Sequence, residues 1–531
     1  MGSSARASTL AEVCLRAAHT HGPATAVHDG TERLTYADLG RRALHFAHAL
    51  VGSRVRPGDR VLISAPNSVG WVVAAFGVAL SGATIVPVND RVTGTERRRV
   101  VEELGPMTVI SEQTGGWGPQ SRVLALADLL AWSGEHGTLP LVTPDMVALV
   151  MQTSGTTGTA KFVPMRHGPL TALYTDLSRR IGLTPRDVAL GPVPLAHGFG
   201  LFGVLLDGLL AGACVRLVRR YEPGTVADLV AMEQVTAILA PPTVFHDLMV
   251  SGRKDIGDRC RIALTGGTSV SLPWFHETCD ALGIERRLVG YGMTEAYGAI
   301  AFGDVTDQRS EALPKLAPLP GVEMEIVDVS GSPQGRDAPG EIRVRGASVL
   351  VDATGWLDTG DLGRLTRDGR LVVLSRLTDT VIVSGFNVDP VEVEQVLRSQ
   401  PGVVDAAVLG VPDPRRGELL VGCVVMSGSA PFDRASLDAA CRARLAPYKV
   451  PVELIELTAV PTTYTGKRSR RILRELVVRR RAEQHASHVG DRQQTADPTV
   501  DRDHDPVDVR RVVTGQEARH PGDVLGGTEP P

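Results

Sequence analysis

The stretch Thr153-Ser-Gly-Thr-Thr-Gly-Thr-Ala-Lys161 follows directly on the apolar run 147–151. Glycines and small hydroxyl residues after a strand let the backbone approach an anion closely, and Lys161 adds a mobile positive charge. The spacing differs from the common nucleoside-triphosphate loop, because Lys161 comes three residues after Gly158 rather than directly after a glycine. The stretch predicts a phosphate-binding loop, and an ordinary Ser/Thr/Gly turn is the alternative. The residues that would contact phosphate are Thr153, Ser154, Gly155, Thr156, Thr157, Gly158 and Lys161.

The composition is that of an ordinary globular protein with more than one domain. The chain has 531 residues, of which 43% are hydrophobic and 22% are charged, and this length exceeds what one core usually holds. A net charge of -4 gives no electrostatic footprint for nucleic acid or an anionic membrane. The six cysteines show no CxxC spacing, so neither a zinc site nor a disulfide scaffold is indicated. We expect buried free thiols in a reducing cytoplasm, and a homo-oligomer remains open.

The longest apolar stretch, residues 70–88, nearly reaches the length that spans a membrane. Gly77, Ser81 and Gly82 interrupt it, and Pro87 stands near its end. We therefore expect a buried helix followed by a short strand, and no membrane span.

Helical and strand patterns alternate from the N-terminus to about residue 300. Alternation of this kind is typical of an α/β fold, in which parallel sheets are covered by helices. The predicted elements are a helix at 36–51 and strands at 60–64, 84–88, 238–240, 261–264 and 287–288.

The pattern changes after this point. Closely spaced strands indicate a β-rich subdomain, and a smaller α+β unit begins at Arg376. The last segment lacks aromatic residues and cannot bury a core, so we expect it to be disordered. The predicted domains are 1–375, 376–480 and 481–531. The predicted elements are strands at 323–327, 340–345, 370–374, 404–408 and 420–425, and helices at 390–399 and 434–444.

Two further glycine-rich turns follow predicted strands, at 264–268 and 290–295. Three such turns at strand ends point to one crevice at the carboxyl edge of a parallel sheet. In the last turn, Thr294 and Glu295 either cap a helix or, beside a phosphate loop, supply a hydroxyl and a magnesium ligand. The residues that these turns contribute are Gly266, Gly267, Thr268, Tyr291, Gly292, Thr294 and Glu295.

Three more polar positions complete the set. Asp361 ends Trp-Leu-Asp-Thr-Gly-Asp, where a carboxylate could accept two hydrogen bonds from a ribose diol or form a structural Asx turn. Arg376 stands where the chain passes into the smaller unit. Lys467 follows a glycine in Pro461-Thr-Thr-Tyr-Thr-Gly-Lys467, and a surface-loop lysine is its alternative.

In this order, the motifs resemble those of the adenylate-forming superfamily, which contains acyl- and aryl-CoA synthetases, luciferases and the adenylation domains of peptide synthetases. The resemblance runs from about residue 10 to 480 and implies a large N-terminal domain with a small mobile C-terminal domain. It includes Pro194-Leu-Ala-His197-Gly-Phe-Gly200, Gly340-Glu-Ile-Arg-Val-Arg-Gly346 and Gly385-Phe-Asn-Val-Asp-Pro-Val-Glu-Val-Glu394.

The resemblance also implies the chemistry. A carboxylic acid attacks the α-phosphate of ATP, pyrophosphate leaves, and a nucleophile then takes the acyl group from the acyl-adenylate. The loop 153–161 would grip the β- and γ-phosphates, Thr294 would contact the α-phosphate, and Glu295 would hold Mg²⁺. Lys467 would bridge acid and α-phosphate during adenylation, and the smaller domain would then rotate to withdraw it.

The remaining roles follow from the same resemblance. The turn 266–268 and Tyr291 would frame the adenine, while Asp361 and Arg376 would hold the ribose hydroxyls. His197 would sit between the acyl pocket and the path of the nucleophile, with a backbone-bonded loop histidine as the alternative. Four flanking residues depart from the family pattern, and none of them removes a charge that the chemistry needs. They are Ala160, Phe162, Ser375 and, at the expected hinge, Thr378.

The acid pocket is expected to be apolar, which favours a hydrophobic or aromatic monocarboxylic acid. Coenzyme A is the favoured acceptor, because the turn Ser384-Gly-Phe-Asn-Val388 resembles that of CoA ligases. An amide synthetase, which couples an aryl acid to an amine in antibiotic pathways, is the main alternative. A catalytically inactive binding protein and a luciferase-type oxidase are the others. The apolar residues expected at the pocket are Phe199, Phe202, Phe245 and Leu288.

Overall fold

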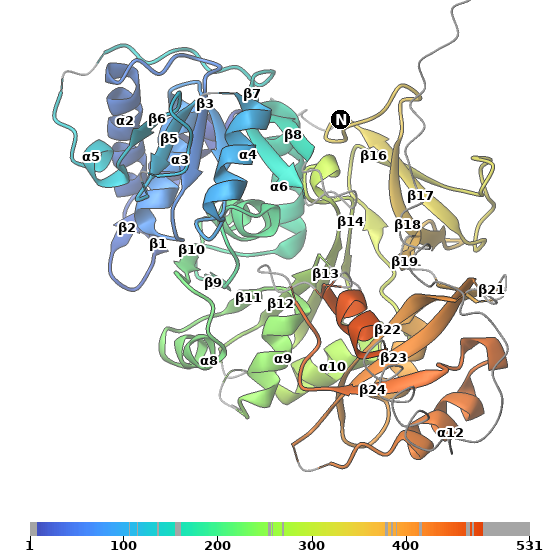
Figure 1. Cartoon of the computed structure of the whole chain (residues 1–531). Coiled ribbons are helices and arrows are strands. Elements are labelled where there is room, and N and C mark those ends of the chain that lie inside the picture. The colour runs from blue at the N-terminus through green and yellow to red at the C-terminus, as the bar shows by residue number, and fades with distance from the viewer. Residues whose placement is uncertain are drawn as a thin grey trace, which may run out of the picture. The chain divides into compact units, whose positions relative to one another are not determined.

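Two mainly parallel sheets form the first part of the chain (Figure 1). The chain divides into two units, Met1–Arg474 and Glu475–Pro531, and every strand named below belongs to the first. The computed structural model describes residues 8–105, 107–113, 115–134, 137–153, 161–252, 256, 259–267, 270–377, 381–383, 386–388, 390–413, 417–428, 430–462, 468–469 and 472–481.

The first sheet has six strands in the order β6-β5-β3-β4-β7-β8. Neighbouring strands run parallel, except that β7 and β8 pair as an antiparallel hairpin at one edge. Its strands are β3 (Arg60–Ser64), β4 (Thr84–Pro87), β5 (Thr108–Ser111), β6 (Arg122–Leu124), β7 (Val147–Thr153) and β8 (Lys161–Arg166). The helices that alternate with them along the chain are α2 (Tyr36–Gly52), α3 (Val69–Leu80), α4 (Gly94–Leu104) and α5 (Leu126–Leu130).

Helix α3 and strand β4 confirm the helix–strand unit expected for the longest apolar stretch. Ser68 caps α3, since its hydroxyl accepts the backbone N–H of Trp71 at 3.2 Å. Every residue of this helix is buried. A Cβ on Gly77 would lie 2.6 Å from the ring of Phe46, so glycine permits α2 to cross α3 closely. Within the described residues, no helix combines the length and low polarity that a membrane crossing requires.

The second sheet has nine strands in the order β15-β14-β13-β12-β11-β9-β10-β1-β2. Its middle strands, from β1 to β13, run parallel, and antiparallel strands close both edges. Its strands are β1 (Thr25–His28), β2 (Arg33–Thr35), β9 (Val188–Gly191), β10 (Cys214–Leu217), β11 (Ala237–Leu239), β12 (Ile262–Gly266), β13 (Arg286–Tyr291), β14 (Ala301–Asp304) and β15 (Ala317–Pro318). Its helices are α1 (Leu10–His21), α6 (His167–Ile181), α7 (Asp207–Ala211), α8 (Pro223–Met232), α9 (Pro242–Val250) and α10 (Leu272–Ala281), with a π-helix η1 (Phe199–Leu206).

The rest of the first unit contains two smaller sheets. One is an antiparallel sheet of four strands, which confirms the β-rich subdomain: β16 (Val322–Val327), β17 (Gly340–Gly346), β18 (Leu357–Leu365) and β19 (Leu371–Arg376). The other forms the α+β part: β20 (Val381–Val383), β21 (Phe386–Val388), β22 (Val403–Asp413), β23 (Gly417–Met426) and β24 (Glu453–Leu457), with α11 (Pro390–Arg398), α12 (Arg434–Arg444) and the 3-10 turn η4 (Pro447–Lys449). The predicted α/β fold with its β-rich and α+β parts is therefore confirmed.

Five of the six cysteines are buried, as expected, and Cys214 is half-buried. Burial raises the pKa of the Cys14 and Cys260 thiols to about 12 and that of Cys214 to about 11. These thiols therefore stay protonated near neutral pH and behave as small core residues rather than nucleophiles.

The buried His167 at the start of α6 makes a contact whose contribution to stability should depend on pH. Its Nδ1 accepts the backbone N–H of Leu10 at 3.1 Å, and burial lowers its pKa from 6.5 to about 4. The unfolded chain therefore binds the proton at higher pH than the folded chain. The stability from this residue is complete above about pH 6.5 and is lost as the pH falls toward 4, up to ~3 kcal/mol.

Chemical denaturation at pH 7 and pH 4.5 measures this effect. In His167→Gln the free energy of unfolding should depend less on pH than in the wild type. The exposed His19 provides the control, because His19→Gln should leave the pH dependence unchanged. Equal pH dependence in His167→Gln and the wild type would contradict the prediction.

Candidate functional site

Strands β12 and β13 bring two of the glycine-rich turns side by side. They pair in parallel with Gly266 opposite Gly290, and a Cβ on Gly266 would lie 2.4 Å from the carbonyl oxygen of Gly290. Gly267, which follows, has a φ of +77°, a conformation that favours glycine. A Cβ on Gly292 would lie 2.2 Å from the carbonyl oxygen of Gly298. Glycine at these strand ends is therefore required by the close approach of the backbone segments.

Tyr291, Asp361 and Arg376 meet although they are far apart in the sequence. The Tyr291 hydroxyl donates to Asp361 Oδ2 at 2.6 Å, and Arg376 Nε donates to Asp361 Oδ1 at 2.9 Å. Asp361 is only 6% exposed. Burial, and then the Asp361 charge, raises the pKa of Tyr291, so the phenol remains a hydrogen-bond donor. Each carboxylate oxygen has a second lone pair, which is the capacity needed to accept one further hydroxyl.

Asp361 does not end a tight turn, and this corrects the sequence-based expectation. It lies within strand β18, opposite Arg376 of β19, at an irregularity in the pairing. Gly360 takes a φ of +70° there, and its N–H donates to Glu341 Oε1 at 3.1 Å. The Asx-turn alternative is also wrong, because the carboxylate is bound by Tyr291 and Arg376 instead. Burial raises the pKa of Glu341. This residue belongs to the Gly340–Gly346 motif, to which the resemblance assigned no role.

Thr294 and Glu295 lie in the 3-10 turn η2 (Thr294–Ala296), directly after β13. Neither side chain caps it, because the N-cap is Met293 and makes no side-chain cap bond; the capping alternative is wrong. Glu295 is half-buried, and its backbone carbonyl accepts the N–H of Leu350 at 2.8 Å. A half-buried carboxylate beside the strand-end turns fits a cation that binds one or two carboxylates and phosphate oxygens. Glu295 therefore suits the magnesium role expected of it.

The loop between Thr153 and Lys161 belongs to a different sheet from the other two turns. It joins β7 to β8, with Thr153 paired opposite Lys161, in the six-stranded sheet, so the expected crevice at the edge of one sheet is wrong. The two sheets contact each other at the far end of this hairpin, because the N–H of Arg166, the last residue of β8, donates to the Tyr297 hydroxyl at 3.1 Å. Tyr297 follows η2, and η2 also contacts β7. These contacts join the hairpin to the segment after β13, and the place of the 153–161 loop in the site stays a prediction.

The described residues do not include every predicted site residue. The side chain of Lys161 is exposed at the first position of β8. The residues that lie outside the described part of the chain are Ser154, Gly155, Thr156, Thr157, Gly158, Thr268 and Lys467, together with the side chain of Thr153 and the expected hinge residue Thr378.

His197 lies between β9 and η1, and its ring is fixed by the backbone. The ring Nδ1 accepts the backbone N–H of Phe199 at 3.2 Å. The backbone N–H of His197 donates to the Pro194 carbonyl at 3.0 Å. With Nδ1 accepting, a neutral ring carries its proton on Nε2. The alternative, a loop histidine bonded to the backbone, thus holds for Nδ1. The proposed role of Nε2, between the acyl pocket and the path of the nucleophile, stays a prediction.

Asn67 holds the segment that carries His197, and no sequence pattern pointed to this residue. Its Nδ2 donates to the carbonyls of Val193 and Val218, at 2.8 and 3.1 Å, and its Oδ1 accepts the N–H of Leu195 at 2.8 Å. The residue is buried, so all three bonds replace bonds to water. These partners are distant in sequence, and no local pattern predicts them.

Asn67→Leu should lower the free energy of unfolding by ~3 kcal/mol or more. The change leaves two buried carbonyls and one buried N–H without their partner, and each such loss costs ~1–3 kcal/mol. Urea denaturation measures it. The control is the half-buried Asn89 in Asn89→Leu, where the N–H of Arg91 loses an acceptor. Equal effects of the two substitutions would contradict the role assigned to Asn67.

The residues expected to line the acid pocket differ in exposure. Phe202, Phe245 and Leu288 are buried in the hydrophobic core, and the Phe245 ring packs edge-on against Phe275 at 5.6 Å. Phe199 is partly exposed, and its ring covers Gly203, where a Cβ would lie 2.6 Å from it. Phe199 is therefore the one of these four that a bound molecule could contact without displacing the core.

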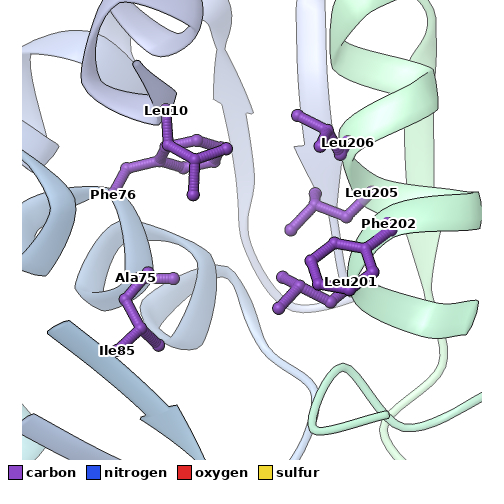
Figure 2. Close-up of a pocket in the computed structure, with 8 residues that line it drawn as sticks. All are labelled: Leu10, Ala75, Phe76, Ile85, Leu201, Phe202, Leu205 and Leu206. Carbon is purple, nitrogen blue, oxygen red and sulfur yellow. The ribbon is translucent and has the colours of Figure 1, made fainter. Parts of the chain in front are cut away.

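An apolar cavity lies behind η1 (Figure 2). Leu201, Phe202 and Leu205 of η1 face Ala75 and Phe76 of α3 across it. Its volume is about 20 Å³, roughly what one water molecule needs, and a cavity with an apolar lining stays dry. It is too small for an organic acid, so we do not assign it to substrate.

Known proteins share both the sequence and the fold. The family model for the AMP-binding enzyme matches residues 14–351, and that for its C-terminal domain matches residues 392–467. Feruloyl-CoA synthase from Amycolatopsis sp is 34% identical over 85% of this chain and 96% of its own length. The 2-succinylbenzoate–CoA ligase of Geobacillus kaustophilus (strain HTA426) is 32% identical over 85% and 95%.

One solved structure adds the fold. The O-succinylbenzoate coenzyme A synthetase (MenE) from Bacillus subtilis, in complex with ATP and magnesium ion, superimposes with a TM-score of 0.76. It is 28% identical, and the match covers 86% of this chain and 98% of that one. These findings confirm the resemblance inferred from the motifs. The chain belongs to the AMP-binding enzyme family.

Proposed function

We propose that this chain is an ATP-dependent acid–thiol ligase that activates a carboxylic acid as its acyl-adenylate and transfers the acyl group to coenzyme A. The observation that carries the proposal is the buried Asp361 carboxylate. It is held between Tyr291, the last residue of β13, and Arg376, the last residue of β19. A positioned carboxylate with two remaining acceptor sites suits a ribose diol. The relatives named above are CoA ligases by name, and one was solved with ATP and magnesium ion.

The site residues would share the work of the first step. Tyr291 and the backbone of Gly266 and Gly267 would frame the adenine, and Thr294 would contact the α-phosphate. The loop 153–161 would grip the β- and γ-phosphates. Glu295 would hold Mg²⁺, which neutralises phosphate charge when it is bound. Each role places donors or charge where negative charge grows as pyrophosphate leaves.

Lys467 would bridge the acid and the α-phosphate from the C-terminal domain. We propose the boundaries 1–375, 376–480 and 481–531, with a hinge at or beside Thr378, so that rotation at the hinge withdraws Lys467 after adenylation. His197, with its Nε2 carrying the proton, would stand between the acyl group and the incoming thiol. Both ATP and coenzyme A are metabolites of the cytoplasm, and we place the enzyme there.

The acid is proposed to be aromatic or otherwise hydrophobic. The partly exposed ring of Phe199 offers an apolar surface beside His197, and the two named relatives take aromatic acids, feruloyl and succinylbenzoate. Coenzyme A is the proposed acceptor. An amine acceptor, as in an amide synthetase, is the alternative outcome of the test.

Mass spectrometry of the products tests the proposal. The full chain is incubated with ATP, Mg²⁺ and a panel of aryl and fatty acids, each with coenzyme A and separately with a panel of amines. We expect an acyl-CoA and AMP from aryl acids. Amide in the presence of amine, with acyl-adenylate but no thioester, would move the enzyme to the amide synthetases. Absence of acyl-adenylate with every acid would overturn the proposal.

A further inference from the structure

A cluster of charges surrounds one buried carboxylate in the α+β part of the chain. Glu394 of α11 is 4% exposed, and its Oε1 accepts the N–H of Val408 at 2.9 Å. Its Oε2 accepts Arg398 Nη2 at 2.6 Å and Arg468 Nη1 at 3.2 Å. A buried carboxylate is stable only when it is paired and hydrogen-bonded in this way, so the cluster fixes both arginines in place.

Arg468 is held by its backbone as well as by its side chain. Its guanidinium also donates to the Ala406 carbonyl at 2.9 Å and to Asp405 on β22. Its backbone pairs with Thr462 in an antiparallel bridge, and the next N–H, that of Ser469, donates to the Pro461 carbonyl at 2.8 Å. The planar guanidinium makes these bonds in several directions at once, which sets its orientation.

Arg468 is also the residue that follows Lys467 directly. We propose that Arg468 is a positioning residue for adenylation: it fixes the chain next to Lys467 on the Glu394 and Asp405 carboxylates, so that the lysine is delivered to the acid and the α-phosphate in one geometry. This inference rests on the proposed function. A misplacement of ~1 Å can cost ~100-fold in rate, so an anchor one residue away matters to a lysine with a long flexible stem.

Arg398 offers a matched control, because it binds the same groups from elsewhere in the chain. It donates to Glu394, to Asp405 at 3.3 Å and to the Ala406 carbonyl at 2.9 Å, but it lies on α11 and is not adjacent to Lys467. Loss of Arg398 therefore weakens the same charge cluster and leaves the Arg468 contacts to Glu394 and Asp405. A defect specific to Arg468 separates positioning from folding.

The test measures the two half-reactions separately, with the melting temperature, for Arg468→Met, Arg468→Lys and Arg398→Met. Adenylation is followed by pyrophosphate exchange, and thioester formation starts from supplied acyl-adenylate and coenzyme A. We expect Arg468→Met to slow adenylation ~10- to 100-fold and leave thioester formation within about a factor of two. Arg468→Lys should recover part of the loss, and Arg398→Met should lower the melting temperature while sparing both rates.

Three results would overturn the inference. One is an equal loss of both half-reactions in Arg468→Met; another is a loss of adenylation in Arg398→Met as large as that in Arg468→Met. An unchanged adenylation rate in Arg468→Met would overturn it as well. These outcomes differ from failure of the proposed function, in which the wild-type chain itself forms no acyl-adenylate from any acid of the panel.

Discussion

Lys467→Ala is expected to slow adenylation by ~10²–10³-fold or more, while thioester formation from supplied acyl-adenylate continues near the wild-type rate. In the proposed mechanism the ammonium bridges acid and α-phosphate, where negative charge grows during the first step. Removing one such donor commonly costs ~10²–10³-fold. The second step starts after this charge has left, so it does not need the lysine. Pyrophosphate exchange and acyl-CoA formation from synthetic acyl-adenylate measure the two steps.

Lys449→Ala controls for the loss of a lysine from the same part of the chain. Lys449 Nζ bonds to Glu392 Oε2 at 2.5 Å in a partly buried ion pair. No step of the proposed mechanism uses this lysine, so both half-reactions should continue. If Lys467→Ala slowed both steps equally, the two-conformation account would fail. If it slowed neither, the lysine would be an ordinary surface-loop residue, which is the alternative that its sequence leaves open.

The elements that the sequence predicted well are those whose pattern is local. Helix α12 was expected at 434–444 and is found at Arg434–Arg444, capped by Asp433, whose carboxylate accepts the N–H groups of Ala435 and Ser436. Strand β22 was expected at 404–408 but runs over Val403–Asp413. It pairs with β23 alone at the edge of its sheet, and an edge strand tolerates the missing N–H of Pro412.

What the sequence did not predict depends on contacts between distant segments. Alternating strands and helices look the same in either sheet, so the motif order could not show that the 153–161 loop belongs to one sheet and the turn at Tyr291 to another. Tyr297 takes a φ of +52°, which is uncommon for a residue other than glycine, and its hydroxyl bond to Arg166 spans both sheets. A single chain carries no local signal for such a bond.

Asp361 shows both what the sequence predicts and what only the structure reveals. Its place beside the ribose was expected from its motif, whereas its partners Tyr291 and Arg376, which fix the carboxylate in that position, are shown by the structure. Tyr291 occupies one lone pair of Oδ2, and Arg376 occupies one lone pair of Oδ1. Each carboxylate oxygen therefore keeps one further acceptor position. A carboxylate held in this manner is already oriented before nucleotide binds, and orientation reduces the entropy that binding has to overcome.

Asp361→Asn is accordingly expected to raise the KM for ATP ~10- to 100-fold, since hydrogen bonds to a charged group contribute ~1.5–3 kcal/mol each. An amide nitrogen cannot accept, so one ribose hydroxyl loses its acceptor. Preference for ATP over 2′-deoxy-ATP or 3′-deoxy-ATP should fall with it, because the deoxy analogue lacks the bond that the variant can no longer form. Adenylation rates with the three nucleotides measure this preference.

Asp358→Asn is the matched control for this substitution. Asp358 lies on the same strand but is exposed, so its loss should change neither the KM for ATP nor the preference among nucleotides. A large rise in KM with the nucleotide preference intact would show that Asp361 serves only to hold Tyr291 and Arg376. An unchanged KM would remove the ribose from the proposed site altogether. Loss of both affinity and preference is the result that a carboxylate bound to the diol requires.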